Sequence, residues 1–200
     1  MYHVVLTLAW FLGPIYATIP LFALFVGRVK KFLHPRRPSL YLIIPFWFVM
    51  MAVVYLVTLP WREAVLYHSL FAWLASVFLF AIAILIYVHS RLHFSRIQVI
   101  GHRQAESAKD RRLVTAGIRQ HVRHPVYLAH LCMLLAWTVG SGEIVLYGLT
   151  MFALLTGWPM IRQEEAELED WFGDEYRTYK RAVPAALVPR VFRFAKTRQH

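Results

Sequence analysis

Two short groups of polar residues, about 40 positions apart, suit a ligand that carries both a negative and a positive charge. Arg123, His124 and Pro125 come directly before an apolar run, and the acidic pair, Glu164 and Glu165, follows the next one. Pro125 fits the first turn of a helix, where free N–H groups bind carboxylates. The first group would therefore hold a carboxylate and the acidic pair an ammonium, which predicts an amino-acid-like zwitterion.

The elements that must position these residues are apolar helices. Hydrophobic residues make up 58% of the 200 residues and charged residues only 16%, which is more apolar surface than one soluble domain of this size can bury. About 20 apolar residues cross a bilayer as a helix. We expect an all-α integral membrane protein with five transmembrane helices, formed by the charge-free runs 4–27, 39–61, 64–90, 126–142 and 144–161.

The last two runs are short, and Gly140-Ser141-Gly142-Glu143 lies between them. This segment predicts a tight helical hairpin rather than one long helix. Because the two helices of a hairpin are antiparallel, the start of the fourth span and the end of the fifth must be neighbours. The hairpin is therefore the reason for expecting the residues near His124 and the acidic pair to meet.

The basic residues predict the orientation in the membrane. The first connection, the third connection and the C-terminal tail hold 5, 8 and 8 of the 22 Lys and Arg residues, and the second connection holds only Arg62. Basic loops stay in the cytoplasm, so the N-terminus is expected outside and the C-terminus inside. The net charge of +11 then reflects topology and anionic lipid rather than nucleic acid. The length and the lack of a retention or transit signal favour a prokaryotic plasma membrane.

We expect one integrated membrane domain with two regions. Residues 1–112 form a three-span region with its cytoplasmic loop, and residues 113–200 form the hairpin with a cytoplasmic C-terminal segment. That segment begins as an amphipathic helix lying on the membrane, which Gly173 weakens or divides. Its apolar stripe recurs at three- and four-residue steps: Leu168, Trp171 or Phe172, Tyr176 and Tyr179.

This pair of segments resembles the superfamily of isoprenylcysteine carboxyl methyltransferases and phospholipid N-methyltransferases. The matching residues cover about 113–189 and stand in the same order as in the family pattern: Gly117, Arg123, His124, Pro125, Tyr127, Arg162, Glu164, Glu165, Leu168, Phe172, Gly173, Tyr176, Tyr179 and Pro189. Arg119 and His121 stand where the family usually has tyrosines, and Ala129 replaces the usual glycine. These departures leave the methyl acceptor open.

The resemblance implies S-adenosylmethionine as cofactor, whose methionine part is the zwitterion expected above, in a pocket roofed by the C-terminal segment. By position in the pattern, the cofactor-binding residues are His124, Pro125, Tyr127, Glu165 and His121. The residues expected to take part in catalysis are Arg123, Arg162 and Glu164. Gly140-Ser141-Gly142 lacks the spacing and the preceding strand of a soluble nucleotide-binding glycine motif.

Methyl transfer needs mainly alignment of the reactants and exclusion of water. We expect O-methylation of the carboxylate of an isoprenylcysteine-like substrate, with Arg162 or Arg123 holding that carboxylate. Phospholipid or small-amine N-methylation is the alternative, with Glu164, Glu165 or His121 as the base. A small thiol or another lipophilic acid is a further option. The predicted partners are thus a lipophilic substrate and membrane lipids, while the oligomeric state stays open.

Two other classes of function remain. His89 and His93 lie four positions apart, and His121 and His124 three apart, with His102 and His130 nearby. Membrane metal oxidases use several such histidine groups. His-His doublets and acidic ligands are absent from these groups, so we expect no metal. A membrane scaffold or transporter subunit is the second alternative, although the spans carry no charge. The single cysteine, Cys132, excludes a disulfide framework and a thiolate zinc site.

Overall fold

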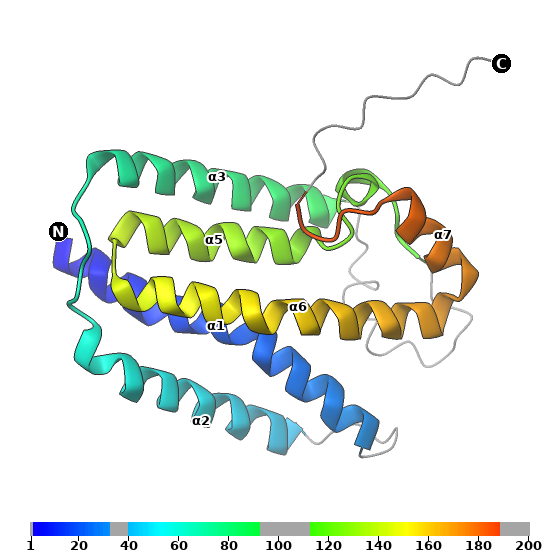
Figure 1. Cartoon of the computed structure of the whole chain (residues 1–200), viewed down its shortest axis with the longest axis horizontal. Coiled ribbons are helices and arrows are strands. Elements are labelled where there is room, and N and C mark those ends of the chain that lie inside the picture. The colour runs from blue at the N-terminus through cyan, green and yellow to red at the C-terminus, as the bar shows by residue number, and fades with distance from the viewer. Residues whose placement is uncertain (1, 33–39, 93–112, 189–200) are drawn as a thin grey trace. The chain divides into compact units, whose positions relative to one another are not determined.

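The computed structural model describes residues 2–32, 40–92 and 113–188. Within these ranges the regular structure is helical, which confirms the all-α prediction (Figure 1). The 3-10 helices are η1 (Leu59–Trp61) and η3 (Gly117–Gln120). The α-helices are α1 (Tyr2–Phe32), α2 (Leu40–Thr58), α3 (Leu70–Leu92), α5 (Pro125–Ser141), α6 (Ile144–Phe172) and α7 (Asp174–Ala182).

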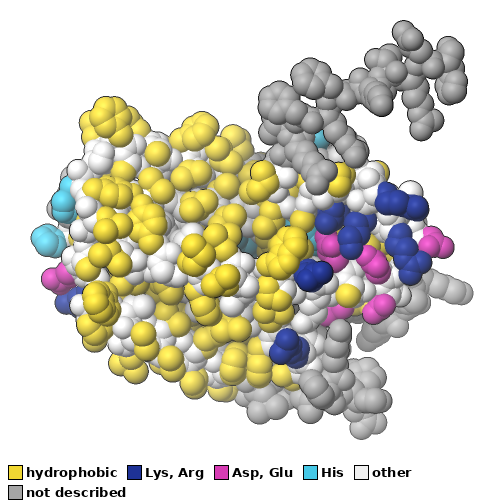
Figure 2. Space-filling view, viewed as in Figure 1, with side chains coloured by type: hydrophobic (Ala, Val, Ile, Leu, Met, Phe, Trp, Pro, Cys, Tyr) yellow, Lys and Arg dark blue, Asp and Glu magenta, His cyan; other side chains and the backbone are white. Residues whose placement is uncertain are grey.

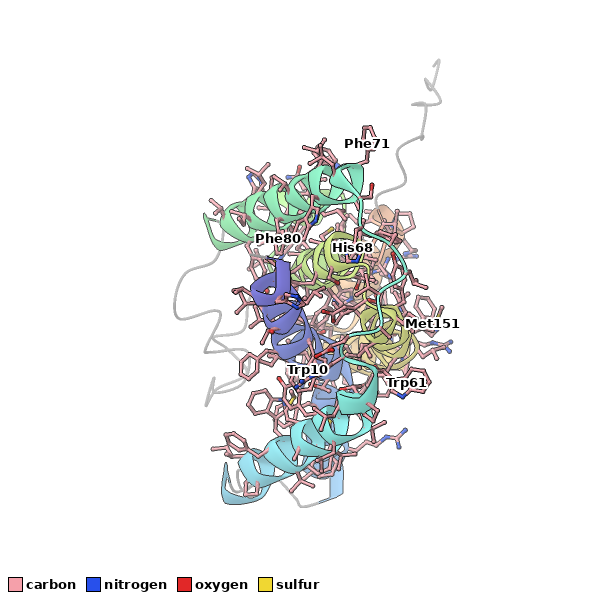
Figure 3. The ribbon with its side chains drawn as sticks, turned by 90° about the vertical axis from the view of Figure 1, so that its left-hand side faces the viewer. Trp10, Trp61, His68, Phe71, Phe80 and Met151 are labelled. Atoms are coloured by element: carbon pink, nitrogen blue, oxygen red, sulfur yellow. The ribbon has the colours of Figure 1, made fainter. Side chains whose placement is uncertain are left out.

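Four helical stretches are long and apolar enough to cross a membrane: His3–Val29, Ile44–Trp61, Leu70–Ser90 and Ile144–Phe172. The fifth predicted span corresponds to α5, which is apolar but has only 17 residues. On the face that Figure 2 shows, hydrophobic side chains dominate over these helices, whereas charged side chains gather over α7. Phe71 on α3 and Met151 on α6 point away from the helices around them (Figure 3) and are 82% and 57% exposed. An integral membrane protein fits these surfaces.

The chain divides into two compact units, each built from two separate stretches. Unit 1 comprises Met1–Ala83 and His130–Ala166, and unit 2 comprises Ile84–Ala129 and Glu167–His200. Both α5 and α6 therefore contribute residues to both units. The predicted division into the regions 1–112 and 113–200 follows the chain rather than its contacts, and it stays a prediction.

The α5–α6 hairpin of unit 1 forms as the sequence predicts. A hydroxyl–hydroxyl hydrogen bond of 2.8 Å joins Thr138 on α5 to Thr150 on α6 and fixes their antiparallel register. Small side chains allow helices to approach closely in a membrane, and three alanines belong to the buried core of this unit. That core consists of Ala9, Ala17, Leu134, Val145, Leu146, Leu149 and Ala153.

The third apolar run does not become helical where the sequence predicts. It was expected to begin at Ala64, but α3 begins at Leu70. Ala64 and Leu66 instead hydrogen-bond to the α5–α6 turn, through Ile144 N–H to Ala64 O at 3.0 Å and Leu66 N–H to Gly142 O at 2.8 Å. Gly142 has a φ of +70° and lies against the backbone of Tyr67. These two bonds give partners to Ala64 O and Leu66 N–H outside a helix.

In unit 2, α6 ends at Phe172, and Gly173 with a φ of +55° separates it from α7. The predicted break at Gly173 is therefore confirmed. The apolar stripe of this segment passes through Phe172, since Trp171 is exposed. Rather than simply facing a membrane, the stripe packs in a core of unit 2 made of Tyr176, Tyr179 and Val183 with Leu113, Leu168 and Phe172.

Candidate functional site

A tight turn in unit 2 carries Arg123 and His124. After η3, the N–H groups of His121 and Val122 both donate to Ile118 O, at 3.0 and 3.1 Å. Val122 is buried, and so are Arg123 and His124, which are 7% and 6% exposed. His121 is exposed. The local fold therefore turns two of the expected site residues inward and leaves His121 at the surface.

The C-terminal segment 183–186 is fastened to this turn by backbone hydrogen bonds. The N–H groups of Arg123 and His124 donate to the carbonyls of Ala185 and Ala186, each at 3.0 Å. The Arg123 guanidinium also donates through Nη1 to Val183 O at 2.7 Å. This part of the chain thus covers the turn, and its role as the roof of a cofactor pocket stays a prediction.

A side-chain bond joins α7, which precedes the 183–186 segment, to η3, which precedes the turn. Tyr179 Oη donates to Arg119 O at 2.7 Å. Tyr179 and Tyr176 are buried and pack with Val183. Tyr179 therefore links the elements that lie directly before the 183–186 segment and the turn, and both tyrosines pack against Val183.

The start of α5 completes the part of the site that lies in unit 2. Pro125 is the first residue of α5, as predicted, and is fully buried. The rings of His124 and Tyr127 stack with centroids 5.6 Å apart and planes at 18°. Leu128 N–H donates to His124 O at 3.2 Å and begins the helix. The N-terminus of a helix is the positive end of its dipole, so this end is suited to an anion.

The other expected site residues, Arg162 and the acidic pair, follow one another along α6 in unit 1. Glu165 is buried at 7% exposure, Glu164 is half-buried and Arg162 is exposed. The sequence placed this group at the end of the fifth span, but α6 runs on without a break to Phe172. The two groups of site residues belong to different compact units, and their meeting stays a prediction.

Glu143, a residue that the sequence analysis gave no role, is the most completely buried acid that the structure describes. It is 0% exposed, and neither carboxylate oxygen has a hydrogen-bond partner among the described residues. Burial raises the pKa of this carboxyl from its ordinary value of 4.5 to about 7. The sequence signal for this residue is a lone acid between two apolar runs.

The histidine groups of the sequence are its candidate metal ligands. The described residues contain no cluster of three or more His, Cys, Asp or Glu side chains that could hold a metal ion. His93 and His102 lie outside the described residues, as does Pro189. His130 on α5 lies beside the ring of Tyr16 on α1, with centroids 6.0 Å apart.

Comparison with known families defines the class of protein. A family model described as "Protein of unknown function (DUF1295)" matches residues 26–183. Because this match spans most of the chain, the protein belongs to the DUF1295 family. Together with the relatives that follow, it confirms the resemblance to the isoprenylcysteine methyltransferase-like membrane superfamily.

Several curated relatives share part of the chain. Methanethiol S-methyltransferase 1 of Bradyrhizobium diazoefficiens is 35% identical over 97 residues, covering 48% of this chain and 33% of that protein. Protein-S-isoprenylcysteine O-methyltransferase of Schizosaccharomyces pombe is 36% identical over 83 residues, covering 40% and 34%. An uncharacterized protein of Haemophilus influenzae is 44% identical over 59 residues, covering 29% and 94%. The chain thus spans about a third of the length of the two methyltransferases, and no solved structure matches it.

Proposed function

We propose that this protein transfers a methyl group from S-adenosylmethionine to a lipophilic acceptor at the cytoplasmic face of a membrane. The observation that carries the proposal is the covered turn of unit 2, in which the 183–186 segment is bonded to Arg123 and His124. It matches the roof that the superfamily resemblance implies. The relatives named as methyltransferases support the same reaction class.

The residues present fit the charges of the cofactor. The positive end of α5, with His124, Pro125 and Tyr127, suits the carboxylate of the methionine part. Glu165, with its neighbour Glu164, suits the ammonium group. His121 is exposed and lies at the edge of this set. When bound, S-adenosylmethionine supplies a methyl group activated on a sulfonium.

We propose that His124, Pro125 and Tyr127, and the acidic pair with them, bind the cofactor, as their places in the superfamily pattern imply.

The roles of the arginines follow from their bonds. Arg123 is buried and donates a hydrogen bond to Val183 O. We propose that its main role is to hold the 183–186 segment in place. Arg162 is exposed on α6. We propose that Arg162 holds the acceptor carboxylate, which is ionised at neutral pH and needs no base. For an amine acceptor, Glu164 would accept the proton.

Binding of S-adenosylhomocysteine, measured calorimetrically on the purified protein in detergent, tests the cofactor site. We expect His124→Ala and Glu165→Gln each to abolish binding. Glu175→Gln is the matched control, because Glu175 is an exposed carboxylate on α7, and its affinity should equal that of the unchanged protein. Full-strength binding by both site variants would reject the proposal.

The acceptor is proposed to be the carboxylate of an isoprenylcysteine-like substrate. A small thiol is the second candidate, favoured by the relative named methanethiol S-methyltransferase. Membranes containing the protein, incubated with methyl-labelled S-adenosylmethionine, distinguish the two. A base-labile label indicates an ester and supports the first acceptor, whereas a base-stable label on a thiol indicates a thioether and supports the second.

The orientation in the membrane is part of the same proposal. The cofactor must come from the cytoplasm, and the positive-inside rule places the C-terminus there. An alkaline phosphatase domain fused after His200 should be inactive in bacterial cells, because that enzyme needs disulfides that form only outside the cytoplasm. An active fusion would put the site on the wrong side.

A further inference from the structure

The first span, α1, contacts α6, and the α1 residues at the contact are two glycines and a proline. A Cβ atom at Gly13 would overlap a methyl group of Leu146, and a Cβ at Gly157 of α6 would lie 4.0 Å from Pro20. A Cβ at Gly27 would overlap the amide nitrogen of Gln163. Position numbers rise together along both helices, so α1 and α6 run parallel in unit 1, and Gly13, Pro20 and Gly27 mark the contact every seven residues.

The contact nearest to the expected site is the one between Gly27 and Gln163. The end of the Gln163 side chain occupies the place that a side chain at position 27 would take. Gln163 stands directly before the acidic pair and directly after Arg162 on α6. Gly27 and residues 162–165 all belong to unit 1, so the contact is internal to one compact unit.

We infer that Gly27 is a positioning residue for the acidic pair, because it provides the seat for the Gln163 amide that fixes this turn of α6. The inference rests on the proposed function, since the acidic pair matters here as the cofactor's ammonium site. It gives a role to α1, which carries no residue of the recognised pattern. The Gln163 side chain seated against Gly27 limits the rotation of α6 about its own axis. Such a rotation would move Glu165 away from its ligand.

A substitution at Gly27 should act on Gln163 rather than on the fold. The overlapping atoms are the far end of a flexible side chain, so an added methyl displaces the amide and leaves the two backbones in place. Gly148 on the same helix α6 offers a matched control, because nothing lies within 4 Å of the Cβ that an alanine would add there. Both changes replace a helical glycine by alanine, so they share the same effect on helix propensity.

The experiment is a double-mutant cycle read by calorimetric binding of S-adenosylhomocysteine. Gly27→Ala and Gln163→Ala should each weaken binding about tenfold, a size typical of residues in direct contact. The double variant should bind no more weakly than Gln163→Ala alone, because the added methyl then has no amide to displace. Gly148→Ala should bind like the unchanged protein, and all variants should keep its thermal midpoint in detergent.

The outcomes distinguish a failure of the positioning role of Gly27 from a failure of the cofactor site. If Gly27→Ala binds like Gly148→Ala, or costs the same factor with and without the Gln163 side chain, the positioning role is wrong while the cofactor site stands. Should Gly27→Ala fail to fold, Gln163→Ala cannot clash and decides the matter: unchanged affinity would overturn the inference. If the unchanged protein does not bind S-adenosylhomocysteine, the proposed function fails and the inference fails with it.

Discussion

Arg123 and Glu143 are ionisable residues buried in different units of the chain, and the fold treats them in opposite ways. Arg123 is 7% exposed and donates to Val183 O at 2.7 Å. Glu143 is 0% exposed, and its carboxylate oxygens have no hydrogen-bond partner among the residues that the structure describes. The buried guanidinium of Arg123 thus has a hydrogen-bond acceptor, whereas the part of the chain that the structure describes offers the Glu143 carboxylate no donor.

The difference follows from what each group can do with its proton. A guanidinium stays charged at any pH that a protein meets, so its burial requires hydrogen-bond acceptors. A carboxyl can take up a proton and become neutral when burial disfavours its charge. Arg123 can therefore fasten a neighbouring segment at neutral pH. Glu143 makes the turn that it occupies sensitive to pH.

The largest expected effect is that of Arg123→Ala. It removes a charged donor and leaves Val183 O without its partner, which should lower the free energy of unfolding by about 3 kcal/mol. Thermal unfolding in detergent measures the loss, and limited proteolysis should show earlier cleavage near residues 183–186. Arg177→Ala is the control, since Arg177 pairs with Asp174 at 2.9 Å on an exposed surface. Equal losses from both variants would mean that the buried Arg123 side chain contributes no more to stability than an exposed ion pair.

The second effect concerns the pH dependence of stability. The pKa of Glu143 is raised to about 7 in the folded state from 4.5, so the folded state binds more protons between these values and is favoured at low pH. This contribution should fall by roughly 2–3 kcal/mol between pH 5 and pH 8. Glu143→Gln should lack it and be more stable than the unchanged protein at pH 8.

The other ionisable groups near Glu143 should not produce the same pH dependence of stability. Tyr67 Oη donates to Val139 O at 3.0 Å and is bonded to Tyr147 Oη at 2.5 Å. Arg62 and Glu63, on the same connection, pair with each other at 3.4 Å, and the Glu63 side chain is 79% exposed. Glu63→Gln is therefore the matched control and should keep the pH dependence. If Glu143→Gln keeps it too, the buried carboxyl is not its source.

The smallest expected effect comes from the hydrogen bond between α7 and η3. Tyr179→Phe removes the bond to Arg119 O and keeps the ring in its core, so it should cost about 1 kcal/mol of unfolding free energy. The measurement is again the thermal midpoint in detergent. A loss as large as that of Arg123→Ala would mean that α7, rather than the guanidinium, holds the C-terminal segment.

Apolar length and charge pattern predicted much of the fold. The hairpin around Gly142 and Glu143, the start of α5 at Pro125 and the break at Gly173 were all placed from the sequence. These features depend on local chemistry, namely glycine at positive φ and proline in a first helical turn. The start of α3 was misplaced because residues 64–66 pair with a turn nearly eighty positions away, and no local pattern records that pairing.

The candidate site divides in the same way. Residue types and the order of the pattern identified His124, Tyr127 and the acidic pair as candidates, and the burial of His124 and Glu165 is consistent with that choice. The hold of Arg123 on Val183 was not foreseen. Its partner is a backbone carbonyl, which every residue has, so no side chain in the sequence marks it.

By itself, then, the sequence determined that this chain is an all-helical membrane protein of a methyltransferase-like superfamily, because apolar length, charge bias and motif order are properties of the chain. Only the tertiary structure decided which buried charge has a partner, which glycine receives the Gln163 amide and which segment covers the Arg123 turn. These depend on the packing of residues far apart in sequence, where a single hydrogen bond or one methyl group of space changes the outcome.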